Sequence, residues 1–131
     1  MIEFPTTNLT ISNEMKGKLP SLPFDKYKSA ILGTPYELTI NFIGEKKMQE
    51  LNNNYRKIDK VTDILSFPLD EKTGEIFICE KYAEKKSASF GRTPENYLNF
   101  LIIHGLVHLK GYDHGPQMER TEVKFRKKFG I

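Results

Sequence analysis

The sequence predicts a domain in which α-helices and β-strands are mixed, and two contrasting hydrophobic patterns carry that prediction. Residues 36–42 alternate apolar and polar side chains, which is the two-residue period of a strand with one face in water. Residues 97–109 are apolar at nearly every position around a helix, which is typical of a buried helix. No repeat, low-complexity tract or linker divides residues 1–131, so we expect a single domain.

The N-terminal part of the chain predicts a short strand and a helix. Residues 2–11 have the character of a strand and turn. A helix is expected from about Pro23 to Leu32, with Ser21 as its cap and Gly33 just past its end. Proline favours the first turn of a helix, and glycine favours the position after the last turn.

The middle of the chain predicts another helix and two further strands. After the strand at 36–42, a helix is expected from Glu45 to about Asn54, and residues 55 and 56 then open a loop. Two short apolar runs, 62–67 and 75–79, flank a turn-forming segment, which predicts a largely buried hairpin.

Strong helix signals mark the C-terminal part. After a modest helix over residues 81–88, Thr93, Pro94 and Glu95 supply a cap, a first-turn proline and a first-turn acid. The apolar helix therefore begins there, and Gly111 should end it. The last helix, residues 117–129, is expected to have a basic outer face and a thin inner stripe. That stripe consists of Met118, Glu122, Phe125 and Phe129.

Composition and charge exclude several classes of protein. The formal net charge of +3 permits a nucleic-acid partner without arguing for one. The apolar stretch at 97–109 contains polar residues and is shorter than the ~20 residues that span a bilayer. The single Cys79 cannot form an intrachain disulfide, and the N-terminal residues lack the features of a signal peptide. A cytoplasmic protein without a membrane anchor is expected.

All three histidines of the chain fall within residues 104–114. His104 and His108 are four residues apart on the predicted buried helix, so their side chains point the same way, ~6 Å apart along its axis. Gly111 then breaks the helix and allows His114 to turn back towards them. Three nitrogen donors at this spacing leave the fourth position of a tetrahedral ion for water or substrate, which is the plan of a catalytic metal site.

An alternative treats each histidine as hydrogen-bonded separately, two of them in the core and His114 in a loop. We favour the metal site because one spacing accounts for all three side chains. Zinc suits the donor set, although imidazole also binds nickel, copper and iron. A chain of this length buries enough surface to fold without a metal, so the ion is expected to serve chemistry rather than folding.

The residue after the first histidine argues against peptide hydrolysis. Zinc metalloproteases with this spacing carry a glutamate there as general base, whereas this chain has Gly105. A water activated by the metal remains available as a nucleophile, but any base or charge clamp must come from elsewhere in the chain.

Two blocks of the sequence resemble one bacterial protein family. The run HGLVHLKGYDH, residues 104–114, is similar to the signature of the YbeY family of rRNA maturation factors and single-strand-specific endoribonucleases. A second block, with Leu51-Asn52, Tyr55-Arg56 and TDILSFP at 62–68, resembles that family's other hallmark. Gly74-Glu75-Ile76 stands where the family usually has Gly-Asp-Ile.

The resemblance, over about residues 41–129, implies an α+β fold. A small mixed sheet of about four strands would pack against about five helices, with the metal site on a buried central helix. The family also implies one zinc ion per chain, or nickel or another divalent ion, held by His104, His108 and His114. Only Arg56 stands where the family has a cleft arginine, whose guanidinium can clamp a phosphate and stabilise charge on a phosphodiester.

The implied function is a cytoplasmic, metal-dependent endoribonuclease that cuts single-stranded RNA during rRNA processing. Its roles would include 16S rRNA 3′-end maturation and ribosome quality control. The expected partners are rRNA, the small ribosomal subunit and assembly factors. Two alternatives stay open: a non-catalytic ribosome-assembly factor with a structural metal, and a metal hydrolase of another substrate.

Three further polar residues are candidates for supporting roles. Asp113 either orients an imidazole or caps the turn after the apolar helix. Asp63 and Ser66 are expected to hold the loop near Arg56, because short polar side chains commonly bond nearby backbone. Family members commonly carry an acidic stretch between the last histidine and the final helix, whereas here residues 115–117 lead almost directly into that helix.

Overall fold

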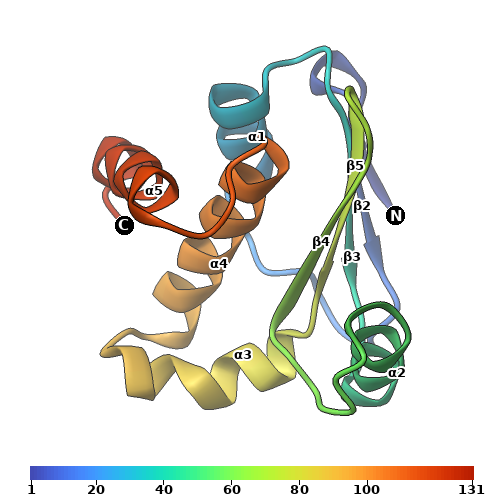
Figure 1. Cartoon of the computed structure of the whole chain (residues 1–131). Helices are drawn as coiled ribbons and strands as arrows, with labels where there is room; N and C mark the ends of the chain where they lie inside the picture. The colour runs from blue at the N-terminus through green and yellow to red at the C-terminus, as the bar shows by residue number, and fades with distance from the viewer.

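The computed structural model describes residues 1–131 and shows an α+β fold, in which five α-helices accompany one five-stranded mixed sheet (Figure 1). The strand order is β1-β2-β3-β5-β4, parallel between β2, β3 and β5 and antiparallel in the two outer pairs. The strands are β1 (Ile2–Phe4), β2 (Leu9–Asn13), β3 (Glu37–Phe42), β4 (Ile64–Asp70) and β5 (Thr73–Ile78).

The sheet has one strand more than the sequence predicts. The segment expected to form one strand and a turn instead folds back on itself as β1 and β2. A short 3-10 turn, Pro5–Thr7, joins the two strands, and Asn8 adopts a left-handed conformation, φ 51°, that suits asparagine. The pairing of β2 with β3 then places this hairpin at one edge of the sheet.

The helices cover the two faces of the sheet unequally. Three helices, α1, α4 and α5, lie on one face, whereas α2 lies on the other and α3 lies below the sheet and α4 (Figure 1). The helices are α1 (Phe24–Leu32), α2 (Glu45–Arg56), α3 (Glu80–Ser87), α4 (Pro94–Leu109) and α5 (Pro116–Phe129).

The main core lies between the sheet and α1, α4 and α5. Alternate residues of β3, including Leu38 and Ile40, are almost completely buried there. They pack in one cluster with Ile102 and Leu106 of α4, so the apolar helix occupies the centre of the fold as its sequence predicts. A smaller cluster on the opposite face includes Met48 of α2 and Leu65 of β4.

The second helix is longer than the sequence predicts. It continues through Tyr55 and Arg56, so these residues occupy its last turn rather than opening a loop. Three consecutive asparagines at 52–54 favour a helix end, but Asn52 is buried and its side-chain amide donates to the carbonyl of Lys60, 2.9 Å away. This tertiary bond supports the extra turn, and Lys57 ends it in a left-handed conformation, φ 59°.

Two other local predictions are wrong. The hairpin turn is tighter than expected, because β4 extends to Asp70 and β5 begins at Thr73. Pro68 is tolerated within β4 because β4 is an edge strand, whose outer side is half exposed rather than largely buried.

The first helix begins at Phe24 with Pro23 at its cap, and Ser21 makes no capping hydrogen bond.

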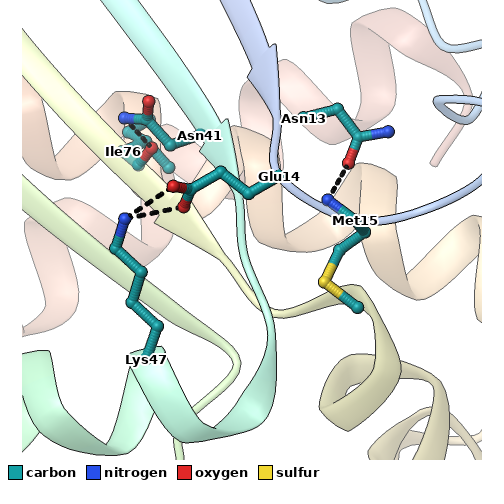
Figure 2. Close-up of polar contacts among 6 residues, drawn as sticks. All are labelled: Asn13, Glu14, Met15, Asn41, Lys47 and Ile76. Atoms are coloured by element: carbon teal, nitrogen blue, oxygen red, sulfur yellow. Dashed lines mark hydrogen bonds and ion pairs between the residues drawn. The ribbon is translucent and has the colours of Figure 1, made fainter.

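Side-chain contacts connect the beginning of α2 to the sheet (Figure 2). The Lys47 ammonium lies 2.7 Å from a carboxylate oxygen of Glu14, which follows β2. Both side chains are about half exposed, so the pair contributes at most about 1 kcal/mol to stability. Nearby, the Asn13 side chain accepts from the Met15 backbone N–H at 3.0 Å, and the Asn41 amide donates to the carbonyl of Ile76 at 3.4 Å. Of these contacts, the Lys47–Glu14 pair joins the first turn of α2, the helix that ends at Arg56, to the segment after β2.

No helix of the structure combines the length and the apolar character needed to cross a membrane.

Candidate functional site

A pocket of about 460 Å³ opens across the edge strand β4. One wall comes from the end of α2 on one face of the sheet, and the opposite wall comes from α4 and the turn after it on the other face. Most of the residues that the sequence singles out meet in this pocket. Its lining includes Arg56, Asp63, Ser66, His104, His108 and His114, together with Tyr55, Thr62, Ile64, Leu65 and Phe67.

Local sequence signals set the position of α4. The Thr93 hydroxyl caps the helix by accepting from the Asn96 backbone N–H at 3.1 Å, as predicted. The helix ends after Leu109, and Gly111 adopts φ 111°, a conformation that L side chains rarely take. The turn at Gly111 allows His114 to fold back towards His104 and His108.

Gly105 lies where α4 comes closest to the sheet. A Cβ atom at this position would sit 2.8 Å from Cδ1 of Ile64 and 3.0 Å from the hydroxyl oxygen of Ser66. A larger residue at this position would require the Ile64 side chain to move.

The three imidazoles lie together at the pocket wall. The ring centroid of His114 is 5.5 Å from that of His104 and 5.6 Å from that of His108, with the planes inclined by about 25° in each pair. In this stacked arrangement, no three His, Cys, Asp or Glu side chains form a ready-made metal site.

Glu122 of α5 fixes the ring of His104. The Nδ1–H of His104 donates to Oε1 of Glu122 at 2.7 Å, and the Glu122 side chain is only 10% exposed. A buried carboxylate needs such a charged or polar partner. The bond leaves Nε2 of His104 free, and a hydrogen bond of this kind commonly orients a metal-binding imidazole.

His108 lies one helical turn after His104 on α4. Its Nδ1 is buried and has no hydrogen-bond partner. Burial lowers the pKa of the His108 imidazole, and the neighbouring His114 and His104 lower it further, against smaller opposing effects of Asp113 and the Tyr112 backbone. The neutral form, which is the form that binds a metal, is favoured. The unpaired Nδ1 and the favoured neutral form are both consistent with His108 as a metal ligand.

Arg56 and Tyr55 form the opposite rim, in the last turn of α2. Arg56 is exposed and makes no ion pair with a carboxylate. The Tyr55 side chain is 67% exposed, and its ring packs against Phe67 with the centroids 5.0 Å apart. A free guanidinium and an accessible aromatic ring thus face the pocket side by side.

The three supporting candidates differ in their contacts. The Asp63 carboxylate accepts from the Tyr97 hydroxyl of α4 at 2.7 Å, and the Ser66 hydroxyl approaches the Gly105 carbonyl at 3.5 Å, the outer limit of a hydrogen bond. Both residues thus connect β4 and its preceding loop to α4. Asp113 is exposed and makes no hydrogen bond to any of the three histidines.

Sequence reasoning missed the role of Glu122. The residue was expected on the inner stripe of the last helix, and Met118, Glu122 and Phe125 are indeed buried there. A single carboxylate in an otherwise apolar stripe was the signal, because a buried charge requires a partner. The sequence spacing alone does not say that the partner is His104, eighteen residues earlier.

Comparisons with known proteins agree with this architecture. The family model described as endoribonuclease YbeY matches residues 6–129, which extends the resemblance well before residue 41. The chain is 31% identical to endoribonuclease YbeY of Staphylococcus carnosus over 139 aligned residues, covering 97% of this chain and 91% of the relative. It is 36% identical to endoribonuclease YbeY of Staphylococcus aureus over 101 residues, covering 66% and 65% of the two chains.

A solved structure shares the fold as well. The solution structure of a protein from Thermotoga maritima superposes with a TM-score of 0.65 at 28% identity, covering 93% of this chain and 89% of that one. The match to the family model spans nearly the whole chain, and the named relatives are phosphodiester-cleaving enzymes. The chain therefore belongs to the YbeY family of endoribonucleases.

Proposed function

We propose that this protein is a metal-dependent endoribonuclease that cuts single-stranded rRNA in the cytoplasm, with His104, His108 and His114 as metal ligands and Arg56 as the catalytic residue. The proposal includes 16S rRNA 3′-end maturation and ribosome quality control, and the small ribosomal subunit with its assembly factors as partners. The observation that carries it is the shared pocket, in which Arg56 and the three imidazoles lie on opposite sides of β4.

The donor set favours zinc. Three imidazole nitrogens without a thiolate suit zinc or nickel, whereas magnesium and calcium prefer oxygen ligands. The buried Nδ1 of His108 without a partner and the Glu122 contact of His104 fit a chain that binds such an ion. A divalent ion held by these imidazoles would polarise a phosphate oxygen and activate a water molecule.

Arg56 provides the charge clamp. A guanidinium binds two oxygens of a phosphodiester at once and stabilises the negative charge that grows on them during attack. No carboxylate competes for Arg56, and the Asp63 carboxylate in the same pocket is engaged with Tyr97. The Arg56 side chain is therefore free to bind phosphate.

Tyr55 favours a single strand as the substrate. An exposed ring beside a phosphate-binding arginine offers a surface on which an unpaired base stacks, which is typical of proteins that bind single-stranded nucleic acid. Bases in a duplex are stacked on one another and are not available to such a ring. A peptide substrate would not require this pairing of arginine and aromatic side chains.

Cleavage of a labelled single-stranded RNA tests the proposal. Wild-type protein should cut the RNA, lose activity after chelation and regain it with zinc or nickel, and it should leave the same sequence intact in a duplex. His108→Ala should abolish cleavage and metal binding. Arg120→Ala, which removes an exposed arginine of α5, is the control and should cut at the wild-type rate.

Two results would overturn the enzymatic proposal. Equal cleavage by wild-type and His108→Ala proteins would indicate a contaminating nuclease. If no metal-loaded form cuts RNA while the chelated protein still binds small ribosomal subunits, the protein is a non-catalytic assembly factor.

A further inference from the structure

A second positively charged site lies outside the histidine pocket, on the ring of Phe100. The guanidinium carbon of Arg92 is 4.5 Å from the ring centroid of Phe100, and that of Arg126 is 4.9 Å from the same centroid. Arg92 precedes α4, whereas Arg126 lies in the last turn of α5. One aromatic side chain thus holds two like charges from distant parts of the sequence.

Arg92 has no acidic partner, whereas Arg126 forms an ion pair with Glu122 and its side chain is 18% exposed. Arg92 forms no ion pair, and its side-chain partner is the neutral amide oxygen of Asn96. The carboxylate of Glu122 lies 3.8 Å from Arg126, but it is also hydrogen-bonded to His104. Both guanidinium groups lie over the same Phe100 ring, 4.5 and 4.9 Å from its centroid, so their like charges repel and an anion that contacts either group would stabilise the arrangement.

The arginine pair lies on the same side of α4 as the histidines. Asn96, Phe100, His104 and His108 follow one another at four-residue intervals along α4, so they lie along one side of the helix. One helical turn, ~6 Å of rise, separates Phe100 from His104. An RNA strand that leaves the histidine pocket along this side of α4 would pass over Arg92 and Arg126 within a few nucleotides.

The surroundings of Arg92 favour nucleic acid over other anions. The Phe90 side chain is 51% exposed, and its ring is stacked on Tyr97 with the centroids 5.0 Å apart. Phe90 and Arg92 line a shallow pocket of about 410 Å³ together with Gly91, Thr93 and Asn96. An accessible ring for a base next to guanidinium groups for phosphates is the combination that single-stranded nucleic acids require. An acidic peptide would use the arginines but not the ring.

We infer that Arg92 and Arg126, supported by Phe100, bind the phosphate backbone of single-stranded RNA outside the cleavage pocket, with Phe90 as a stacking surface. This inference rests on the proposed endoribonuclease function. It extends the RNA-binding surface from the phosphate at the cleavage site to neighbouring nucleotides. Arginine suits the role because its planar guanidinium can stack on an aromatic ring and still present N–H groups to phosphate. The site lengthens the RNA that the protein binds without taking part in the chemistry.

Equilibrium binding of two labelled oligouridines tests the inference. The probes are a 12-nucleotide and a 3-nucleotide RNA with phosphorothioate linkages that slow cleavage, and the proteins are metal-loaded wild type, Arg92→Gln, Arg126→Gln and Arg120→Gln. Arg92→Gln should weaken binding of the long RNA roughly fivefold. For the long RNA, the slope of log affinity against log salt concentration should be about 0.7 less steep for Arg92→Gln than for wild type. This difference corresponds to the loss of one phosphate contact on a single strand. Binding of the short RNA should not change.

The controls separate this site from the rest of the molecule. Arg120→Gln removes the same charge from an exposed position of α5 and should match wild type with both probes. Arg126→Gln should resemble Arg92→Gln with the long probe. If either variant fails to fold, Arg92→Lys keeps the charge without the planar group and should retain the salt dependence of wild type while losing affinity.

The possible failures are distinguishable. If Arg92→Gln and Arg120→Gln have the same affinity and salt dependence, the second site does not exist, although the proposed function stands. If wild-type protein binds neither RNA, the proposed function itself fails. If Arg92→Gln weakens binding of labelled polyglutamate but leaves the affinity for the long RNA unchanged, the site is one for acidic peptides and the inference is wrong.

Discussion

Glu122 shows how one buried residue can organise this pocket. Its carboxylate holds the ring of His104 at 2.7 Å and also lies near Arg126, so it connects the histidines to the arginine pair on Phe100. A carboxylate that is 10% exposed is costly unless it is paired. Its position on α5 therefore joins that helix to α4 through His104.

Substitution of Glu122 tests its role in metal binding. Glu122→Gln keeps the size and an oxygen acceptor for the His104 N–H, but removes the charge that makes the imidazole a better donor to metal. We expect zinc affinity to fall about 10- to 100-fold, with the fold retained. A competition titration with a chromophoric chelator measures this, and unchanged affinity would show that Glu122 serves only helix packing.

At the level of elements, the loop between α2 and β4 is the piece that brings the two walls of the pocket together. Asn52 bonds to Lys60 in the middle of this loop, and Asp63 bonds to Tyr97 at its end. The sequence predicts α4, its Thr93 cap and its end at Gly111, because those signals are local. It misplaces the end of α2, because the bond of Asn52 to Lys60 is a tertiary contact.

Removal of one hydroxyl tests the connection of this loop to α4. Tyr97→Phe leaves the Asp63 carboxylate buried with only a long contact to Thr62, at 3.5 Å. We expect the free energy of unfolding to fall by about 1–3 kcal/mol, as measured by urea denaturation. Tyr82→Phe removes a hydroxyl that has no hydrogen-bond partner and should change stability by less than about 0.5 kcal/mol. Equal losses in both variants would contradict the role of Asp63.

At the level of the whole molecule, the site is assembled from both faces of the sheet. The three histidines are recognisable from the sequence because they are close along the chain, and the structure brings them to one wall. Arg56 reaches the opposite wall only because α2 crosses to the other face and β4 is an edge strand, which no spacing within the sequence predicts. The Glu122 contact and the arginine pair on Phe100 likewise depend on the packing of α5.

The free energy of unfolding of the metal-free protein should depend on pH because the His108 imidazole is buried. The pKa of His108 is lowered in the folded protein, so the unfolded chain binds a proton there at a higher pH than the folded chain does. The stability that this group contributes is therefore present above pH ~6.5 and decreases as pH falls through the lowered pKa. Urea unfolding at pH 7.5 and 5.5 should show a larger loss for wild type than for His108→Asn. An equal loss would exclude His108 as the titrating group.

The central claim is that Arg56 and the three histidines act as one site. Its most direct test compares wild type with Arg56→Ala in two measurements on the same samples, bound metal per chain and the single-turnover rate of cleavage of single-stranded RNA. We predict one metal ion per chain in both proteins and a cleavage rate at least roughly 10²-fold lower in Arg56→Ala, because the charge clamp is lost while the ligands remain. A rate for Arg56→Ala equal to that of wild type, at the same metal content, would contradict the claim.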